Sequence, residues 1–558
     1  MNSQKKKLIA YTLLALSMIS CSQKDSSENR DELAARAGAP LFAGMGSHEH
    51  PVTTANPEAQ LYFNQGLVID FAFNHAESAR SFRAAQTLDP GCAMCFWGEA
   101  LALGPNINVT SNGKAIMSDD ERLKAFAAIQ KAVALKHKVS EAERDYIEAL
   151  AMRYNGDPST PREPLDEAYV NSMRNLHQKY PDDDDAASLF AESMMNTMPW
   201  DYWLDPENPK PLTVEVLNAL ETVLERSPRH PLAIHLYIHA VEASSQPDRA
   251  EGPADRLTGL VPGAGHLVHM PAHIYWRVGR YADASAANVR AAAVDEEYIA
   301  ACNAQGFYPA AYYPHNIHFL WAASSMEGRS AVAIEAARKV AANVRLEMID
   351  DFPGVEFFNT IPLLALTQFG HWDEVLAEPQ PPENLEYSNA IWHYVRATAY
   401  ARKGDLVAAR AEHETFTSLR DATDVTFLDT IYYPATMLLT IADALILGEI
   451  SMAEEDYEEA IGHFWTAVET QDELPYTEPP FWYYPTRHTL GRALLTSGDA
   501  AGAEEVYRAD LQQYPRNGWS LFGLIQALNA QGKDATEFQK RFDKIWAQAD
   551  VSLAASTF

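Results

Sequence analysis

The chain has 558 residues, of which 47% are hydrophobic and 22% are charged, so it is long enough to bury a large core. Its formal net charge of −32 argues against a nucleic-acid partner, because phosphate binding needs clustered Lys and Arg side chains. Its 4 cysteines are too few for a disulfide-stapled scaffold, so the core has to hold the fold together.

The first 20 residues have the pattern of an export signal. Lysines at 5–7 precede an apolar stretch at 8–20 that is too short to span a bilayer. Residues 18–21 resemble the lipobox of bacterial lipoproteins, which implies a lipid on Cys21 and a place in the cell envelope, as a periplasmic or outer-membrane lipoprotein. An ordinary secretory signal cleaved nearby is the alternative. We expect no later membrane-spanning run, so the N-terminal lipid would be the only membrane contact.

Small and aromatic residues recur along the chain with a period of about 34 residues. The clearest copies are Gly66, Ser78, Phe82, Ala85 and Pro90 near the N-terminus, and Gly491, Gly498, Ala503, Tyr507 and Pro515 near the C-terminus. Small residues suit the close crossing of two helices, the aromatic fills the space between them, and Pro ends the second helix. This pattern resembles the tetratricopeptide-repeat family, which implies an all-α solenoid of antiparallel helix pairs, with about eight or more repeats and some insertions.

The repeat register divides the mature chain into four parts. We expect a lipidated tether and extended arm at 21–55, an N-terminal solenoid with a histidine-rich groove at 56–345, a C-terminal solenoid at 346–549 and a tail at 550–558. The chain also resembles secreted bacterial repeat proteins that carry CAMC(F/Y)WG and HLVHMPAHIY segments, a resemblance that implies no settled activity. The oligomeric state stays open.

The inner helices of three successive repeats are rich in histidine. In these repeats, positions 2, 5, 9 and 12 face the concave groove, and they are occupied by His235, His239, Glu242, His266, His269, His273, His315 and His318. Residues three or four apart share a helix face, and neighbouring helices pack about 8–10 Å apart. The sequence therefore predicts a wall of imidazoles with one carboxylate.

Neutral imidazole together with a carboxylate suits zinc, copper or iron, which the sequence does not distinguish. An open-coordinated ion could activate water or dioxygen with Glu242 as general base, which would make the chain a metal-dependent hydrolase or oxidoreductase. A metal carrier is the other metal-based reading. Binding of an anionic or carbonyl ligand without metal, and a cluster with no chemical role, also remain open.

Aromatic side chains mark two further parts of the groove. Trp276, Tyr312 and Tyr313 lie beside the histidines, and His488, Arg492, Trp519 and Phe522 fall on groove positions near the C-terminus. Aromatics with Arg suit peptide or sugar contacts, although plain packing is the alternative. We expect a binding scaffold whose groove takes a protein, a peptide or a small molecule.

Two short motifs lie in or before the first repeats. Cys92 and Cys95 form C-A-M-C, for which a local disulfide, metal ligation and a redox pair are all open. His48 and His50 flank Glu49 just ahead of the first repeat, where they belong either to a solvated linker or to an arm that reaches the groove.

Overall fold

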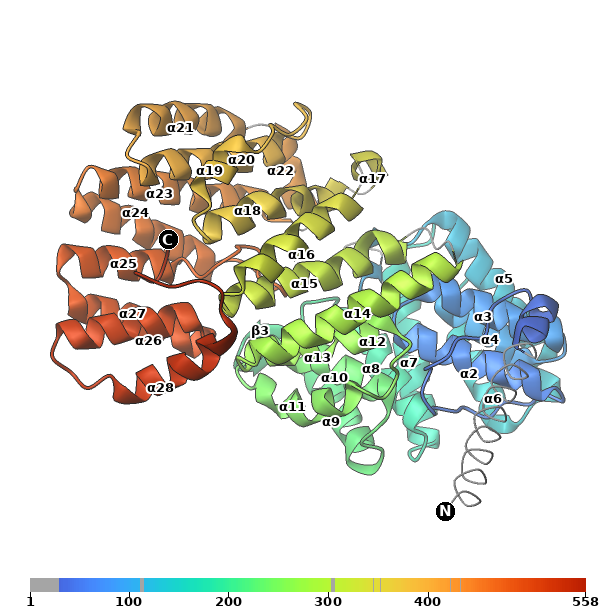
Figure 1. Cartoon of the computed structure of the whole chain (residues 1–558). Coiled ribbons are helices and arrows are strands. Elements are labelled where there is room, and N and C mark those ends of the chain that lie inside the picture. The colour runs from blue at the N-terminus through green and yellow to red at the C-terminus, as the bar shows by residue number, and fades with distance from the viewer. Residues whose placement is uncertain are drawn as a thin grey trace, which may run out of the picture. The chain divides into compact units, whose positions relative to one another are not determined.

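A computed structural model describes residues 30–110, 115–302, 307–344, 346–351, 353–421, 423–431 and 433–558. This part of the chain is almost entirely helical, with strands only in two short ladders (Figure 1). The predicted signal at 1–20 and the predicted lipid on Cys21 lie outside the described residues.

The chain forms two compact units. The first unit comprises 1–202 and 210–236, and the second comprises 203–209 and 237–558. The division falls inside helix α10 (Pro231–Val241).

Helices of the first unit pair in chain order, α2 with α3, α4 with α5, α6 with α7 and α8 with α9. The elements of this unit are α2 (Pro57–Phe71), α3 (His75–Leu88), α4 (Ala93–Ala102), β1 (Val109–Thr110), β2 (Ala115–Ile116), α5 (Asp119–Leu135), η1 (Lys136–Lys138), α6 (Glu141–Ala151), α7 (Arg162–Lys179), α8 (Asp184–Met195), α9 (Pro211–Arg226) and the first part of α10. Strands β1 and β2 pair in parallel.

The second unit begins with an antiparallel ladder of β3 (Trp203–Asp205) and β4 (Asn208–Pro209) and the last part of α10. Its other elements up to 377 are η2 (Pro247–Ala250), α11 (Glu251–Leu257), α12 (Gly265–His269), α13 (Pro271–Arg277), α14 (Tyr281–Cys302), η3 (Tyr308–Tyr312), α15 (Tyr313–Met326), α16 (Ser330–Asn343), α17 (Leu346–Asp351), η4 (Pro353–Thr360), α18 (Ile361–Gln368) and α19 (Trp372–Ala377). The remaining elements are α20 (Glu386–Arg402), α21 (Leu406–Arg420), α22 (Thr423–Thr430), α23 (Ala435–Ala453), α24 (Tyr457–Asp472), α25 (Arg487–Ser497), α26 (Ala500–Gln513), α27 (Gly518–Ala530), α28 (Thr536–Ile545) and η5 (Trp546–Gln548).

Consecutive helix pairs stack on one another within each unit. In the second unit α20 pairs with α21, α23 with α24 and α25 with α26, while the first helices of successive pairs touch as α20 with α23 and α25 with α27 (Figure 1). The first unit repeats this arrangement, with contacts of α2 with α4 and of α4 with α6. These contacts confirm the predicted all-α solenoid.

The small and aromatic residues of the repeat explain the close packing. A Cβ atom on Gly98 would lie 2.3 Å from the Phe82 ring, and one on Gly491 would lie 2.3 Å from the Tyr507 ring. Phe82 also meets Gly66 of its own repeat, and Tyr507 also meets Gly523 of the next repeat. The aromatic fills the space between the two helices of its pair, as the spacing predicts, and in addition contacts the first helix of the next repeat.

Helix α23 bears on the expectation that no membrane-spanning run follows the signal. Among the described residues it alone is long and apolar enough to cross a membrane, with a mean hydropathy of 1.6 over its best window. Most of that window is buried, because α23 packs against α20, α21 and α24. Its composition is that of a central core helix.

The compact units divide earlier than the expected boundary at 345/346. Helix α16 lies before that boundary and packs directly on α18, which lies after it, so the stack is continuous there. The tail at 550–558 is also packed. The Asp550 carboxylate accepts from the backbone N–H groups of Ser330 and Ala331 at the start of α16, at 2.6 and 3.0 Å.

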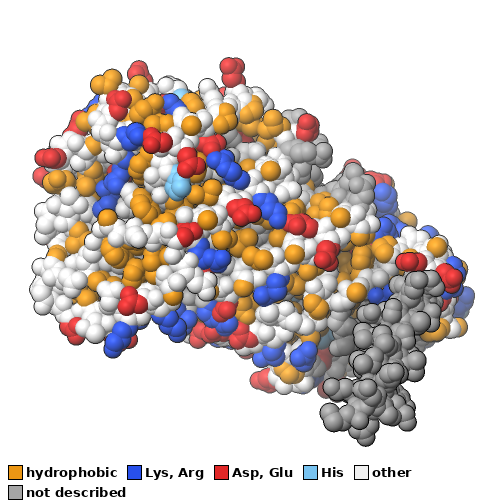
Figure 2. Space-filling model, in the orientation of Figure 1, with side chains coloured by type: hydrophobic (Ala, Val, Ile, Leu, Met, Phe, Trp, Pro, Cys, Tyr) orange, Lys and Arg blue, Asp and Glu red, His pale blue; other side chains and the backbone are white. Residues whose placement is uncertain are grey.

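Charged side chains of both signs are interspersed over the face of the molecule drawn in Figure 2, with hydrophobic side chains between them.

Candidate metal centre

Three imidazole Nε2 atoms converge in the second unit. The Nε2 atom of His269 lies 2.9 Å from that of His273 and 3.1 Å from that of His315. Two nitrogens that share a tetrahedral zinc ion through bonds of about 2.0–2.1 Å stand about 3.3 Å apart, close to these distances. The spacing of these three atoms therefore fits a single shared ion, and the three residues form a group that could hold one.

The local chain geometry brings these rings together. Met270, between α12 and α13, keeps helical dihedral angles of −49° and −36°, so the helical path continues from His269 to His273. These two residues are four apart and share one face. His315 follows Pro314 in the first turn of α15, directly after the π-helical turn η3.

The remaining ring nitrogens of two of these histidines are held by acceptors. Nδ1 of His269 lies 2.6 Å from Oδ1 of Asn288, whose amide nitrogen donates to the Ala284 carbonyl at 2.9 Å. Nδ1 of His273 lies 2.6 Å from Oε2 of Glu242. Both Nδ1 atoms thus carry a proton, which leaves the two Nε2 lone pairs facing each other. Either an additional proton or a cation has to lie between them, and such outer-shell acceptors are typical of metal-bound histidines.

Glu242 holds a second imidazole. Its Oε1 atom lies 2.9 Å from Nδ1 of His239, and both side chains are buried. Burial would raise the pKa of Glu242, but the neighbouring imidazoles of His273 and His239 hold that pKa well below its usual range. This carboxylate stays ionised and orients two rings.

Burial keeps His269 neutral. The side chain is fully buried, and burial together with the nearby His273 ring holds the pKa of His269 well below its usual range. Neutral imidazole is the form that binds metal ions.

The loop between α24 and α25 adds a group that the sequence did not point to. Oε2 of Glu478 lies 3.5 Å from Nδ1 of His273, and the Tyr476 hydroxyl donates to the Glu478 carboxyl. Burial, and then the charge of Glu242, raises the pKa of Glu478 well above its usual range. Arg277 lies over the Tyr476 ring and donates to the backbone oxygen of Glu242. The sequence marks Glu478 only as an acidic residue in an aromatic, Pro-rich segment.

The aromatic segment before α15 lies against the cluster. The backbone N–H of His266 donates to the Tyr308 hydroxyl at 3.2 Å, and the Tyr312 ring packs edge-on to the His266 ring with centroids 4.9 Å apart. Tyr313 donates to Glu296 at 2.9 Å. His266 itself stacks on His269 with centroids 5.7 Å apart.

The predicted ligand His318 has other surroundings. His318 packs against the rings of Trp321, Phe357 and Phe358, and burial lowers its pKa to about 3. His235 belongs to the first unit, where its Nδ1 atom lies 2.6 Å from the Phe71 carbonyl oxygen.

The predicted groove residues near the C-terminus are engaged within the second unit. Trp519 donates to the Ser325 carbonyl at 2.9 Å, and His488 lies 2.6 Å from the Asn517 amide nitrogen. Phe522 packs on Phe542. Trp276 likewise packs against Tyr281 and Phe319.

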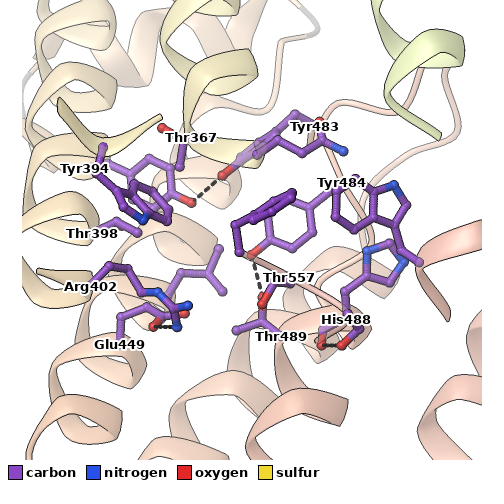
Figure 3. Close-up of a pocket in the computed structure, with 16 residues that line it drawn as sticks. Thr367, Tyr394, Thr398, Arg402, Glu449, Tyr483, Tyr484, His488, Thr489 and Thr557 are labelled. Atoms are coloured by element: carbon purple, nitrogen blue, oxygen red, sulfur yellow. Dashed lines mark hydrogen bonds and ion pairs between the residues drawn. The ribbon is translucent and has the colours of Figure 1, made fainter. Parts of the chain in front are cut away.

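A small pocket of about 40 Å³ lies among residues of α18, α20, α23, α25 and α27 (Figure 3). Tyr394 and Tyr483 bond through their hydroxyls at 2.9 Å on one side of it. On another side Glu449 pairs with Arg402, and the same carboxylate pairs with Arg492. Phe558 from the tail also lines the pocket.

Cys92 and Cys95 are joined by a disulfide at the start of α4. In this state their sulfur atoms are not thiolate ligands.

No protein-family model matches the chain, and no curated protein matches its sequence. Among solved structures, a human IFIT1 dimer with m7Gppp-AAAA is 12% identical with a TM-score of 0.32, covering 77% of this chain and 87% of that one. The APC/C Cut9–Hcn1 assembly is 12% identical with a TM-score of 0.28, covering 88% and 76%. Yeast Tom70 is 11% identical with a TM-score of 0.28, covering 88% and 92%. Likenesses of this size say nothing about what this chain binds.

Proposed function

We propose that this chain is an exported, lipid-anchored repeat scaffold that binds one first-row transition ion through His269, His273 and His315. The observation that carries the proposal is that the Nε2 atoms of these three residues lie about as close together as the ligands of one metal ion do. On two of the rings, the Nδ1 atom is held by an acceptor, Asn288 or Glu242. The Lys-rich apolar start of the sequence supports export.

Zinc is the best match to this donor set. Three neutral imidazoles that leave a fourth position open are the ligands of many catalytic zinc sites, whereas closed structural sites are usually built with cysteine. Imidazole also suits copper and iron, so the test has to offer all three ions.

A scaffold that keeps a bound ion is favoured over an enzyme that turns over a substrate. The rings of His269 and His273 are buried, and Glu242 is already engaged with two imidazoles rather than free to act as a base. A metal-dependent hydrolase is the second candidate. It is favoured by Glu478, whose carboxyl stays protonated beside His273 and could donate a proton to a leaving group.

Metal analysis of the full chain tests the proposal. The protein is purified without an affinity tag, stripped with a chelator and offered zinc, copper and iron separately. We expect the double variant His269→Ala with His315→Ala to bind one ion fewer per chain than the wild type. His318→Phe is the matched control, because His318 lies in the same helix as His315 but packs among aromatic rings. Equal ion content in the double variant and the wild type would refute the proposal.

A further inference from the structure

A second group of imidazoles surrounds one carboxylate in the first unit. Oδ1 of Asp185 lies 3.1 Å from Nε2 of His48 and 3.0 Å from Nε2 of His230. Its other oxygen, Oδ2, lies 2.7 Å from Nδ1 of His50. Three rings from two separate segments thus meet one acid, and His48, Asp185 and His230 form a group of metal-ligating type.

The residues of this cluster come from three parts of the first unit. Asp185 lies in the first turn of α8, and His230 directly precedes α10. His48 and His50 belong to the arm ahead of α2, which is held rather than free. Its anchoring contacts are Gln60 to the His50 carbonyl at 2.9 Å, the His50 backbone N–H to Asn64 at 3.3 Å and the Thr53 backbone N–H to Glu143 at 2.6 Å.

The geometry at His48 suits two ligands of one ion. The Nε2 atom of His48 is buried and stands close to Oδ1 of Asp185, yet it makes no aligned hydrogen bond. The His48 and His230 rings meet edge to face with centroids 4.9 Å apart. The side chains of His230 and Asp185 are only 4% and 10% exposed, so the carboxylate charge is largely withdrawn from water.

We propose that His48, His230 and Asp185 bind a second divalent first-row ion, separate from the one at the three-histidine centre. Two imidazoles and one carboxylate form the donor set of non-haem iron sites and also suit zinc. His50 would hold the non-coordinating oxygen of Asp185 and so orient the carboxylate.

Binding has a defined cost at His230. Its Nδ1 atom accepts from the Ala233 backbone N–H at 3.2 Å, so the neutral ring carries its proton on Nε2 and donates it to Asp185. Coordination through Nε2 requires the neutral ring to carry its proton on Nδ1 instead, so the hydrogen bond from Ala233 is lost. The proton stays on the ring, and the ion takes its place between His230 and Asp185.

The consequence is a metal-dependent clamp on the arm. An ion bound at this site would tie His48 to Asp185 in α8 and to His230 at the start of α10. The arm follows the predicted lipid site, so the ion would fix the point where the tether joins the solenoid. This role does not depend on what the second unit does.

Zinc and iron(II) binding by the stripped full chain tests the inference. The readouts are ions per chain and the rise in melting temperature on adding the ion. We expect His48→Ala and Asp185→Asn each to lose one ion and to melt with a smaller metal-induced rise than the wild type. The His269→Ala, His315→Ala double variant should keep the ion of the first unit, so the two sites fail separately.

His75→Ala is the matched control, because His75 also faces a buried carboxylate, Asp70, at 3.1 Å but does so as a single imidazole. It should bind as many ions as the wild type. His48 lies outside the helices, so its removal leaves the helical core in place, which circular dichroism checks. Unchanged ion content in both His48→Ala and Asp185→Asn would overturn the inference. So would a fall in melting temperature that is the same with chelator and with metal, since a purely hydrogen-bonded clamp behaves in that way.

Discussion

The Nε2 atoms of His269 and His273 face each other at 2.9 Å, while the Nδ1 atom of His269 is held by Asn288 and that of His273 by Glu242. Each ring is thus turned by a hydrogen bond on its far side, and the two lone pairs are brought to one point. The helix partner α14, which carries Asn288, matters to the site as much as the helices that carry the rings.

Asn288→Leu should weaken zinc binding without removing a ligand. Without its acceptor the His269 ring loses its fixed tautomer and orientation, and losses of about 10–100-fold in metal affinity are typical for such partners. Competition titration against a chromophoric chelator measures the change. Asn389→Leu is the control, since Asn389 is a buried amide in α20 that donates to the backbone carbonyls of Pro382 and Leu385. Equal zinc affinity in Asn288→Leu and the wild type would contradict the role of Asn288.

The meeting of His269, His273 and His315 agrees with the repeat period, because helix pairs with one spacing present the same positions to the same side. Asn288 and Glu478 could not be found in this way. Asn288 comes from the second helix of the pair, and Glu478 comes from a loop far from His273 in the sequence.

His318 shows a further limit of the register. His318 follows His315 by three residues in α15, so its side chain points about 60° away around the helix. His315 faces the other imidazoles, while His318 turns into the rings of Trp321 and Phe358. The repeat position alone does not tell which of two neighbouring positions reaches the cluster.

The cluster at Asp185 could not be predicted from the sequence, for a different reason. His48 precedes the repeats, and Asp185 ends the acidic run 182–185, which by itself indicates no site. Contacts between residues this far apart in sequence depend on how the arm packs, which no period encodes.

Asp295 should make stability depend on pH. Burial raises the pKa of its carboxyl to about 7, although Tyr308 and Asn316 donate to it. An unfolded Asp has a pKa of about 3.9, so the folded state binds the extra proton between these values. The stabilising contribution is complete below about pH 4 and is lost as the pH rises towards 7.

Asp295→Asn removes this titration. Thermal melts between about pH 5 and pH 8 should therefore show the melting temperature of the variant rising relative to that of the wild type as the pH increases. The variant and the wild type are compared at the same pH, so the contributions of other titrating groups to the two melting temperatures cancel. Two melting curves that shift in parallel over this range would show that Asp295 does not hold its proton.

Phe82→Ala should lower the free energy of unfolding of the first unit by about 3–5 kcal/mol, the usual range for removing a fully buried phenyl ring. The ring is completely buried between Gly66 and Gly98, whose missing side chains leave no atoms that could fill the space. Urea unfolding measures the change. Phe427→Ala is the control, because Phe427 is 49% exposed and should cost far less. A loss below about 1 kcal/mol for Phe82→Ala would mean that the ring does not lock neighbouring repeats together.

Glu449→Gln should destabilise the second unit more than loss of a surface ion pair does. The Glu449 carboxylate pairs with both Arg402 and Arg492, and although burial alone would raise its pKa, these two guanidinium groups hold the pKa below its usual range. Removing the charge leaves the buried Arg492 and the partly exposed Arg402 side by side without a counter-charge. Breaking a buried pair costs about 3–5 kcal/mol, of which the exposure of Arg402 screens a part. Glu454→Gln is the control, since its pair with Arg410 lies at the surface and is worth less than about 1 kcal/mol. If urea unfolding gave the same loss of unfolding free energy for both variants, Arg402 and Arg492 would have to be screened by water rather than held by Glu449.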